Sequence, residues 1–326
     1  MSNFTINNNI LEKYEGQEET IIIPEDVFII ANSCFSNNRF IKKVIMPKNL
    51  RKICKYAFSE CLRLEEITFN ESLKEIHEYA FFYCKNLKYV TLPSSLNNIE
   101  KNAFSSCHSL EKINIPSAIS EIKEESFLDC KNLKEVQIEN GLTKICEKAF
   151  KNCESLEKIN MPNTLQEIGM LAFNNCKKLN NIILPSNLKL LGYGAFQNCH
   201  SLEKINIPSE ITFINSAAFD HCRNLKTVEF SEGLKEIYEY AFNYCDSLIK
   251  INFPSTLTLI ENGAFDYCFN LSSVTFPSSI KLIGKGAFFS TKLTSVIIHK
   301  DCEISNLPMD YQEKSFPIDC KVNFMD

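Results

Sequence analysis

Phenylalanine recurs every 23 residues through most of this 326-residue chain, and no other sequence feature limits its fold as strongly. A chain that repeats itself at such a period folds as a stack of equivalent coils, because one coil cannot bury its apolar side alone. We therefore expect a solenoid of about twelve coils, with these residues as its inner column. The twelve phenylalanines are Phe35, Phe58, Phe81, Phe104, Phe127, Phe150, Phe173, Phe196, Phe219, Phe242, Phe265 and Phe288.

The rest of each unit predicts one strand and one turn. The consensus L-x-x-[I/V]-x-[I/L/F/M]-P, as in Leu87 to Pro93, alternates apolar residues like a half-buried strand, and proline ends the pairing. The segment around each phenylalanine, such as residues 78–87, has apolar residues about three apart, which predicts a short helical or 3₁₀ turn. The predicted fold class is an α/β repeat solenoid with a parallel β-sheet.

Both ends of the array differ from its middle. Residues 1–19 carry a polar run at Asn7–Asn9 between apolar residues, which predicts an N-terminal cap built as a small hairpin. Residues 20–298 hold the twelve units, and no linker interrupts them, so we expect one domain. The repeat pattern decays over residues 299–326, which we expect to form an irregular C-terminal cap or tail.

The motif L-x-x-I-x-x-x-A-F-x-x-C-x-x-L-x-x-[I/V]-x-[I/L]-P over residues 20–298 resembles the BspA-like class of leucine-rich repeats. The opening F-x-I-x-N-N-x-L-x-x-Y-x-G, from Phe4 to Gly16, is similar to the N-terminal segment of such bacterial proteins. The resemblance implies a curved, horseshoe-shaped solenoid without catalytic residues. It also implies a link to surface adhesion and to the binding of host or matrix proteins.

Composition and charge disfavour several classes of function. The net charge of −5 gives no electrostatic basis for binding nucleic acid. No run approaches the roughly 18 apolar residues of a membrane span. The N-terminus lacks the basic and apolar segments of a signal peptide, so a cytoplasmic location is favoured, with the cell surface as the alternative.

The cysteines and histidines form no recognisable catalytic or metal-binding pattern. Ten of the fifteen cysteines stand three residues after a repeat phenylalanine, which predicts buried, reduced residues that pack as small apolar groups. Cys302 and Cys320 lie in the C-terminal segment and stay open to pairing in an oxidising compartment, although the reduced state is favoured. No C-x-x-C pair or Ser-His-Asp constellation is present, so we expect no metal, no cofactor and no enzymatic activity.

Two columns of the predicted strands face outward. The residue after each strand leucine alternates in sign, as in Lys42, Glu65, Lys88 and Glu111, which predicts ion pairs between neighbouring strands. The mid-strand column carries short polar residues, among them Asn114, Asn160 and Asn206. Two interpretations of these asparagines stay open: they are contacts for a partner, or they form hydrogen bonds between strands.

A second candidate surface lies on the turns. Aromatic residues are enriched at the energetic centres of protein interfaces. Five of them gather in the tenth and eleventh units: Tyr238, Tyr240, Tyr244, Tyr267 and Phe269.

The sequence thus predicts a non-enzymatic scaffold that binds another protein. The alternative is a cell-surface adhesin that binds host or matrix proteins and is exported without a classical signal. The sequence specifies neither the partner nor the oligomeric state.

Overall fold

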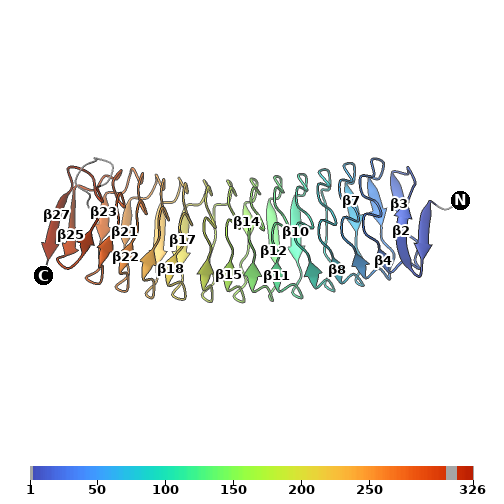
Figure 1. Ribbon diagram of the computed structural model, residues 1–326, viewed down its shortest axis with the longest axis horizontal. Helices are drawn as coiled ribbons and strands as arrows, with labels where there is room; N and C mark the ends of the chain where they lie inside the picture. The colour runs from blue at the N-terminus through green and yellow to red at the C-terminus, as the bar shows by residue number, and fades with distance from the viewer. Residues whose placement is uncertain (1–2, 306–313, 326) are drawn as a thin grey trace. The chain divides into compact units, whose positions relative to one another are not determined.

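The computed structural model describes residues 3–305 and 314–325 and divides into two compact units, Met1–Leu165 and Gln166–Asp326. Each unit is a stack of coils with two columns of parallel strands (Figure 1). The described residues form no helix, and so none that could cross a membrane. The domain boundaries expected at residues 19 and 298 stay a prediction.

In the first unit, a terminal hairpin is followed by two strand columns. The hairpin consists of β1 (Phe4–Asn7) and β2 (Ile10–Tyr14). The first strand column consists of β3 (Thr20–Ile22), β5 (Lys43–Ile45), β7 (Glu66–Thr68), β10 (Lys112–Ile115), β12 (Glu135–Ile138) and β14 (Lys158–Ile159). The second strand column consists of β4 (Ile29–Ile30), β6 (Lys52–Ile53), β8 (Glu75–Ile76), β9 (Asn98–Ile99), β11 (Glu121–Ile122) and β13 (Lys144–Ile145).

The second unit repeats this arrangement. Its first strand column consists of β17 (Lys204–Ile207), β19 (Thr227–Phe230), β21 (Lys250–Asn252), β23 (Ser273–Thr275), β25 (Ser295–His299) and β27 (Lys321–Met325). Its second strand column consists of β15 (Glu167–Ile168), β16 (Leu190–Leu191), β18 (Phe213–Ile214), β20 (Glu236–Ile237), β22 (Leu259–Ile260), β24 (Leu282–Ile283) and β26 (Glu303–Ile304).

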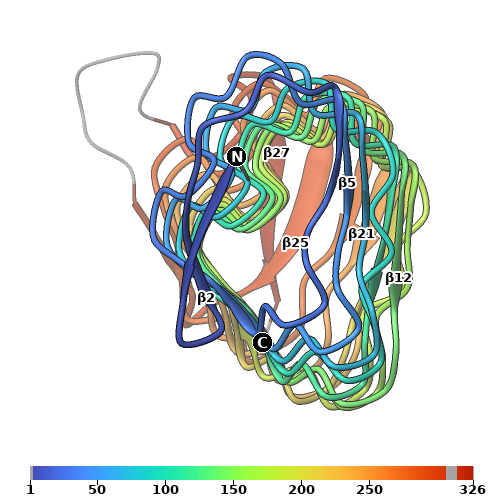
Figure 2. The same cartoon turned by 90° about the vertical axis from the view of Figure 1, so that its right-hand side faces the viewer.

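Paired strands of a column run parallel, and most partners are one repeat apart. Ile113 of β10 lies opposite Val136 of β12, and Ile237 of β20 lies opposite Ile260 of β22. Viewed along the stack, β5 and β12 lie on one side of the coils of the first unit and β2 lies on the other (Figure 2). The second strand column was not predicted from the sequence, because its two-residue strands are too short to show an alternating pattern.

The expected helical turns are wrong. Around Phe81, Tyr79 and Tyr83 both have positive φ, at 58° and 56°, so the right-handed helical conformation is interrupted on each side of the phenylalanine. Backbone N–H groups alternate between two partners: Phe82 N donates to Tyr79 O within the coil at 3.1 Å, whereas Phe81 N donates to Ala103 O of the next coil at 2.8 Å. The segment is therefore a series of β-turns, and such turns share with a helix the spacing of three that the sequence shows.

The phenylalanine column forms the core, as predicted. Adjacent rings stack nearly parallel: Phe81 and Phe104 lie 5.1 Å apart in the first unit, and Phe219 and Phe242 lie 5.1 Å apart in the second. The two rings of each pair are inclined by 10° or less. All twelve are among the largest fully buried side chains. Burial of each ring contributes about 2 kcal/mol, so this column is a large apolar contact between coils.

The expected hairpin at the N-terminus is present. Strands β1 and β2 are antiparallel, with Phe4 opposite Tyr14, and Ile10 of β2 then pairs in parallel with Ile29 of β4. The ring of Tyr14 lies 5.3 Å from that of Phe35 and covers the first ring of the column.

The C-terminal segment is more regular than expected. Strand β27 pairs with β25, β26 pairs with β24, and Phe316 stacks 5.5 Å from Phe288. Residues 299–305 and 314–325 thus extend the stack by two strands and one ring. This extension was not predicted from the sequence, because Phe316 follows Phe288 by 28 residues instead of 23. Residues 306–313 and 326 of this segment, and residues 1–2 of the N-terminal cap, lie outside the described residues.

Replacement of Phe219 by alanine should destabilise the protein by about 3–5 kcal/mol, because it removes a buried ring from between two others. The midpoint of urea denaturation measures this loss, with Phe269→Ala as the control because Phe269 is 49% exposed. Equal midpoints for the two variants would contradict a core built on the phenylalanine column.

Candidate protein-binding surfaces

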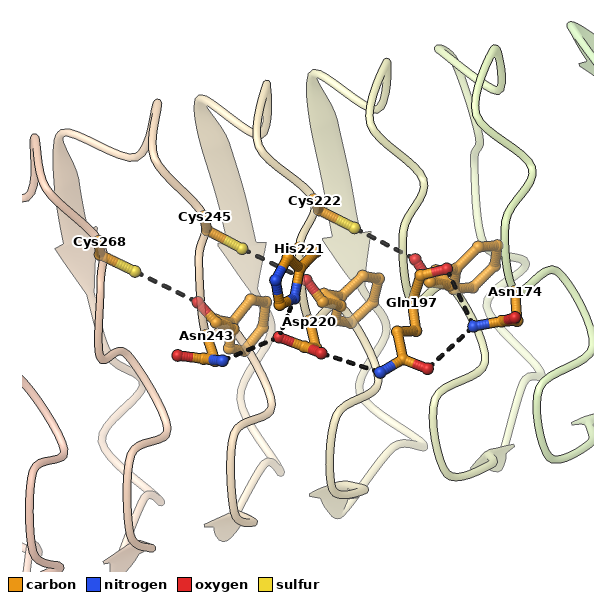
Figure 3. Close-up of polar contacts among 11 residues, drawn as sticks. Asn174, Gln197, Asp220, His221, Cys222, Asn243, Cys245 and Cys268 are labelled. Atoms are coloured by element: carbon orange, nitrogen blue, oxygen red, sulfur yellow. Dashed lines mark hydrogen bonds and ion pairs between the residues drawn. The ribbon is translucent and has the colours of Figure 1, made fainter. Parts of the chain in front are cut away.

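The repeat cysteines lie beside the phenylalanine column and link successive coils. Cys222 Sγ donates a hydrogen bond to the carbonyl oxygen of Phe196 at 3.2 Å (Figure 3). That oxygen also accepts the backbone N–H of Cys199 at 3.2 Å, so the thiol occupies its second acceptor position. The same thiol-to-carbonyl bond is made by Cys61, Cys84, Cys107, Cys130, Cys153, Cys199, Cys222, Cys245 and Cys268.

Burial makes these thiols chemically inert. All ten repeat cysteines are 0% exposed, which confirms the predicted burial. Desolvation raises the pKa of Cys61 to about 12 and raises that of Cys84 well above its usual value. Thiolate is the reactive form of cysteine, so these residues are poor nucleophiles and poor metal ligands. Cys302 and Cys320 are also free thiols in this structure.

A polar ladder runs along the turns of the second unit, one residue after each core phenylalanine (Figure 3). Asn174 Nδ2 donates to Gln197 Oε1 at 2.9 Å, and Gln197 Nε2 donates to Asp220 Oδ2 at 2.9 Å. Asp220 Oδ1 accepts from Asn243 Nδ2 at 3.0 Å and contacts His221 Nδ1 at 2.7 Å. The Asp220 side chain is buried and its carboxylate is hydrogen-bonded, so this ladder stabilises the turns beneath the neighbouring aromatic residues.

The asparagines of the first strand column bind backbone groups of the preceding coil. Asn114 accepts the N–H of Leu92 on Oδ1 at 2.9 Å and donates from Nδ2 to the Leu92 carbonyl at 2.8 Å. The residue pairs Asn160–Ile138 and Asn206–Leu184 repeat both bonds. These observations support the second interpretation of the asparagines, in which they form hydrogen bonds between strands.

The three asparagines that make these bonds belong to a longer sequence period of two repeats. The sequence Lys-Ile-Asn recurs every 46 residues, at 112–114, 158–160, 204–206 and 250–252. Strands β10 and β17 pair through their backbones with β12 and β19 of the following coil, whereas their asparagines contact the preceding coil. The side-chain amide thus supplies hydrogen bonds where the backbone ladder is interrupted.

Hollows lie on the strand face at these interruptions. One of about 350 Å³ is lined by Thr91, Lys112, Asn114 and Glu135, and one of about 450 Å³ beside it is lined by Glu66, Tyr89 and Thr91. In the second unit, a hollow of about 430 Å³ is lined by Ile183, Lys204, Asn206 and Glu229. Ile183 is 80% exposed, so the strand face also presents an apolar side chain.

The alternating charges form the predicted ion pairs at several positions. Lys42 Nζ lies 2.9 Å from Glu19 Oε2, and Lys134 Nζ lies 3.0 Å from Glu111 Oε2. In the second unit, Lys226 Nζ lies 3.0 Å from Glu203 Oε2. These side chains are largely exposed, so each pair contributes no more than about 1 kcal/mol.

Three of the five predicted aromatic residues come together on the turns of the second unit, with a histidine that the sequence analysis did not assign to the cluster. His221 stacks on Tyr244 at 4.4 Å, Tyr244 stacks on Tyr267 at 4.3 Å, and Phe269 meets Tyr267 edge-on at 5.8 Å. We call these four residues the aromatic cluster. Their repeat positions, two and four residues after a core phenylalanine, are the signal that could have identified His221.

The other two predicted residues have different neighbours. Tyr238 stacks on Phe213 at 5.4 Å and donates a hydrogen bond to Glu236 at 2.7 Å. The Tyr240 ring lies against Gly263, where a Cβ atom would come within 2.5 Å of it. Both precede the core phenylalanine of their coil, and their ring contacts are with residues outside the aromatic cluster.

The backbone under the aromatic cluster is left-handed. His221, Tyr244 and Tyr267 have φ values of 59°, 54° and 54°. Glycine and asparagine adopt this conformation at the lowest cost, and a bulky side chain there is uncommon. Asparagine occupies the same repeat position with positive φ in four other coils, at Asn37, Asn152, Asn175 and Asn198.

The family model described as the BspA type leucine rich repeat region (6 copies) matches residues 5–134, 98–226 and 191–309. The chain belongs to this family. Among curated proteins, the sequence comparison finds no match. The BspA-type repeat is a scaffold, and the described residues of this chain contain no group of three or more His, Cys, Asp or Glu that could hold a metal ion.

Solved structures with this fold come from several bacteria. A leucine-rich repeat protein from Bacteroides ovatus is 24% identical, with a TM-score of 0.66, and the match covers 100% of this chain and 98% of that chain. A leucine rich cell surface protein from Faecalibacterium prausnitzii is 26% identical, with a TM-score of 0.57 and coverage of 89% and 91%. A leucine-rich repeat protein from Eubacterium ventriosum is 19% identical, with a TM-score of 0.55 and coverage of 87% and 89%.

Replacement of Asn114 by alanine should destabilise the protein by about 1–3 kcal/mol, because the backbone N–H and C=O of Leu92 lose their side-chain partner. Gln137→Ala is the control, since Gln137 follows Asn114 in the same column but its amide contacts the Glu135 side chain at 3.2 Å. Equal free energies of unfolding for the two variants would show that the asparagine bonds contribute nothing to stability.

Proposed function

We propose that this BspA-type repeat protein is a non-enzymatic scaffold that binds another protein through the aromatic cluster on the turns of its second unit. The observation that carries the proposal is the placement of Tyr244 and Tyr267 at left-handed positions. Four other coils carry asparagine there, which suits the backbone better, so the backbone conformation alone does not explain the aromatic rings.

The exposure of the cluster supports this role. Tyr267 is 37% exposed and Phe269 is 49% exposed, so both rings have apolar surface that a partner can cover. Stacking fixes their orientation before binding, which reduces the conformational entropy lost on association. Aromatic side chains held in this way are typical of the residues that dominate binding energy in protein interfaces.

The strand face is the weaker candidate. Asn114, Asn160 and Asn206 already use both polar atoms of their amides in bonds to the preceding coil. A partner at the strand face would contact side chains that already form hydrogen bonds and ion pairs within the protein.

A surface adhesin is the second candidate function. It is supported by the 26% identity to the F. prausnitzii protein, which is named a leucine rich cell surface protein. Protease treatment of intact source cells separates the two locations: an adhesin is digested, whereas a cytoplasmic scaffold is protected until the cells are lysed.

The double variant Tyr244→Asn, Tyr267→Asn should keep its stability and lose its partner. Asparagine suits the left-handed backbone, so the denaturation midpoint should equal or exceed that of the wild type. A partner identified by pull-down and then purified should bind the variant at least about 30-fold more weakly, since a hot-spot residue contributes about 2 kcal/mol or more.

Tyr89→Asn provides the matched control on the strand face, because Tyr89 is a 64% exposed tyrosine in the first unit. If this control loses the partner while the double variant binds it normally, the partner lies on the strand face and the proposed site is wrong.

A further inference from the structure

A shallow hollow in the second unit is lined by basic and hydrogen-bonding side chains. Its volume is about 480 Å³, and its lining consists of Lys226, Ser247, Ile249, Asn270, Ser272 and Lys292. Two ammonium groups, two hydroxyls and one amide therefore surround an isoleucine that is 58% exposed. These polar groups all include hydrogen-bond donors, and such a set favours an anionic group.

The charge of this hollow distinguishes it from the three on the strand face. Each of those contains a glutamate in its lining: Glu66, Glu135 or Glu229. In two of them the glutamate pairs with a lysine of the same hollow, as Lys204 does with Glu229 at 2.6 Å. No carboxylate belongs to the lining of the hollow between Lys226 and Lys292.

Lys292 is held at this hollow by a neutral partner. Its Nζ donates to Asn270 Oδ1 at 2.8 Å, and Asn270 Nδ2 in turn donates to the backbone carbonyl of Asp246 at 2.8 Å. The ammonium is thus positioned by an amide that does not cancel its charge. Lys226 forms an ion pair with Glu203, which lies 3.0 Å away and outside the lining. Lys292 therefore attracts an anion more strongly than Lys226 does.

The hollow and the aromatic cluster include two consecutive residues of the chain. Phe269 of the cluster directly precedes Asn270 of the lining, and the Phe269 ring is 49% exposed. A ligand that places an anion between the lysines has the exposed Ile249 in the same hollow, and the exposed Phe269 is the residue next to Asn270. This combination suits a polypeptide segment with an acidic residue next to a large apolar one.

We propose that the hollow between Lys226 and Lys292 receives a side-chain carboxylate of the partner protein, adjacent to the partner's apolar contact with Phe269. This assignment rests on the proposed function and adds the chemistry of the partner to it. A carboxylate pairs with Lys292 and accepts hydrogen bonds from Asn270 Nδ2 or the serine hydroxyls, each a charge-assisted bond.

The test uses two short probes with the full-length protein. Acetylated, amidated pentapeptides Gly-Phe-Gly-Glu-Gly and Gly-Phe-Gly-Gln-Gly are titrated at low salt, and NMR chemical shifts of Asn270 and Ser272 report occupancy of the hollow. The glutamyl peptide should shift these signals and the glutaminyl peptide should shift them far less. Lys292→Gln should weaken the binding of the glutamyl peptide roughly threefold, the size expected for one exposed charge pair.

Lys204→Gln is the matched control, because Lys204 lines a hollow of similar size that contains Glu229. This variant should bind the glutamyl peptide like the wild type. Equal shifts with both peptides, or equal weakening by both lysine variants, would overturn the carboxylate site. Stronger binding of inorganic sulfate than of the glutamyl peptide would overturn the assignment to a side chain, because the hollow would then suit a free anion.

Different experimental results would contradict the proposed function and the carboxylate site. If the tyrosine variants lose the partner but Lys292→Gln leaves partner affinity and peptide binding unchanged, the proposed function stands and the carboxylate site is wrong. If the partner binds the tyrosine variants normally while the glutamyl peptide still occupies the hollow, the proposed function is wrong at the aromatic cluster.

Discussion

Each coil depends on backbone hydrogen bonds that its turn makes with the next coil. The N–H of the core phenylalanine donates to the carbonyl of the residue before the next phenylalanine, as Phe58 does to Ala80 and Phe219 does to Ala241, both at 2.8 Å. This bond requires coils in strict register, because a buried N–H without an acceptor costs about 1–3 kcal/mol. The 23-residue spacing, the stacked rings and the parallel strands all follow from that register.

Left-handed residues make this arrangement possible. Residues two before and two after the phenylalanine have positive φ through most of the array, which directs alternate N–H groups toward the next coil. The same geometry projects side chains outward from the turn at the residue before Cys, as at Tyr244 and Tyr267, and at the residue before Ala–Phe, as at Tyr240. The aromatic cluster uses such positions, so the scaffold and its candidate binding surface share one backbone conformation.

Much of the fold could be predicted from the sequence, because the same residue types recur at the core positions of each repeat. Phe81 and Cys84 are buried, and the charge pair Lys134–Glu111 forms as alternation of sign predicts. The turns were not predictable from spacing alone, since residues three apart occur in helices and in successive β-turns. The continuation of the stack at the C-terminus was not predicted, because Phe316 follows Phe288 by 28 residues and so breaks the 23-residue interval.

The candidate surfaces could be predicted only in part. Tyr244, Tyr267 and Phe269 gather because equivalent positions of adjacent coils lie side by side, whereas Tyr238 and Tyr240 have other ring neighbours. The bonds of Asn114 to Leu92 support one of the two interpretations of the strand asparagines, in which they form hydrogen bonds between strands. Nothing in the local sequence reveals the hollow between Lys226 and Lys292, because its residues come from four coils and only the stacking brings them together.

Amide hydrogen exchange of the protein labelled with ¹⁵N-phenylalanine tests the central role of the inter-coil bonds most directly. The account predicts that the core phenylalanine amides, such as those of Phe58, Phe81 and Phe219, exchange slowly and at similar rates within each unit. Phe40, whose amide binds the Asn38 side chain in an exposed turn, should exchange much faster. Core amides that exchange as fast as that of Phe40 would contradict a fold held in register by these bonds.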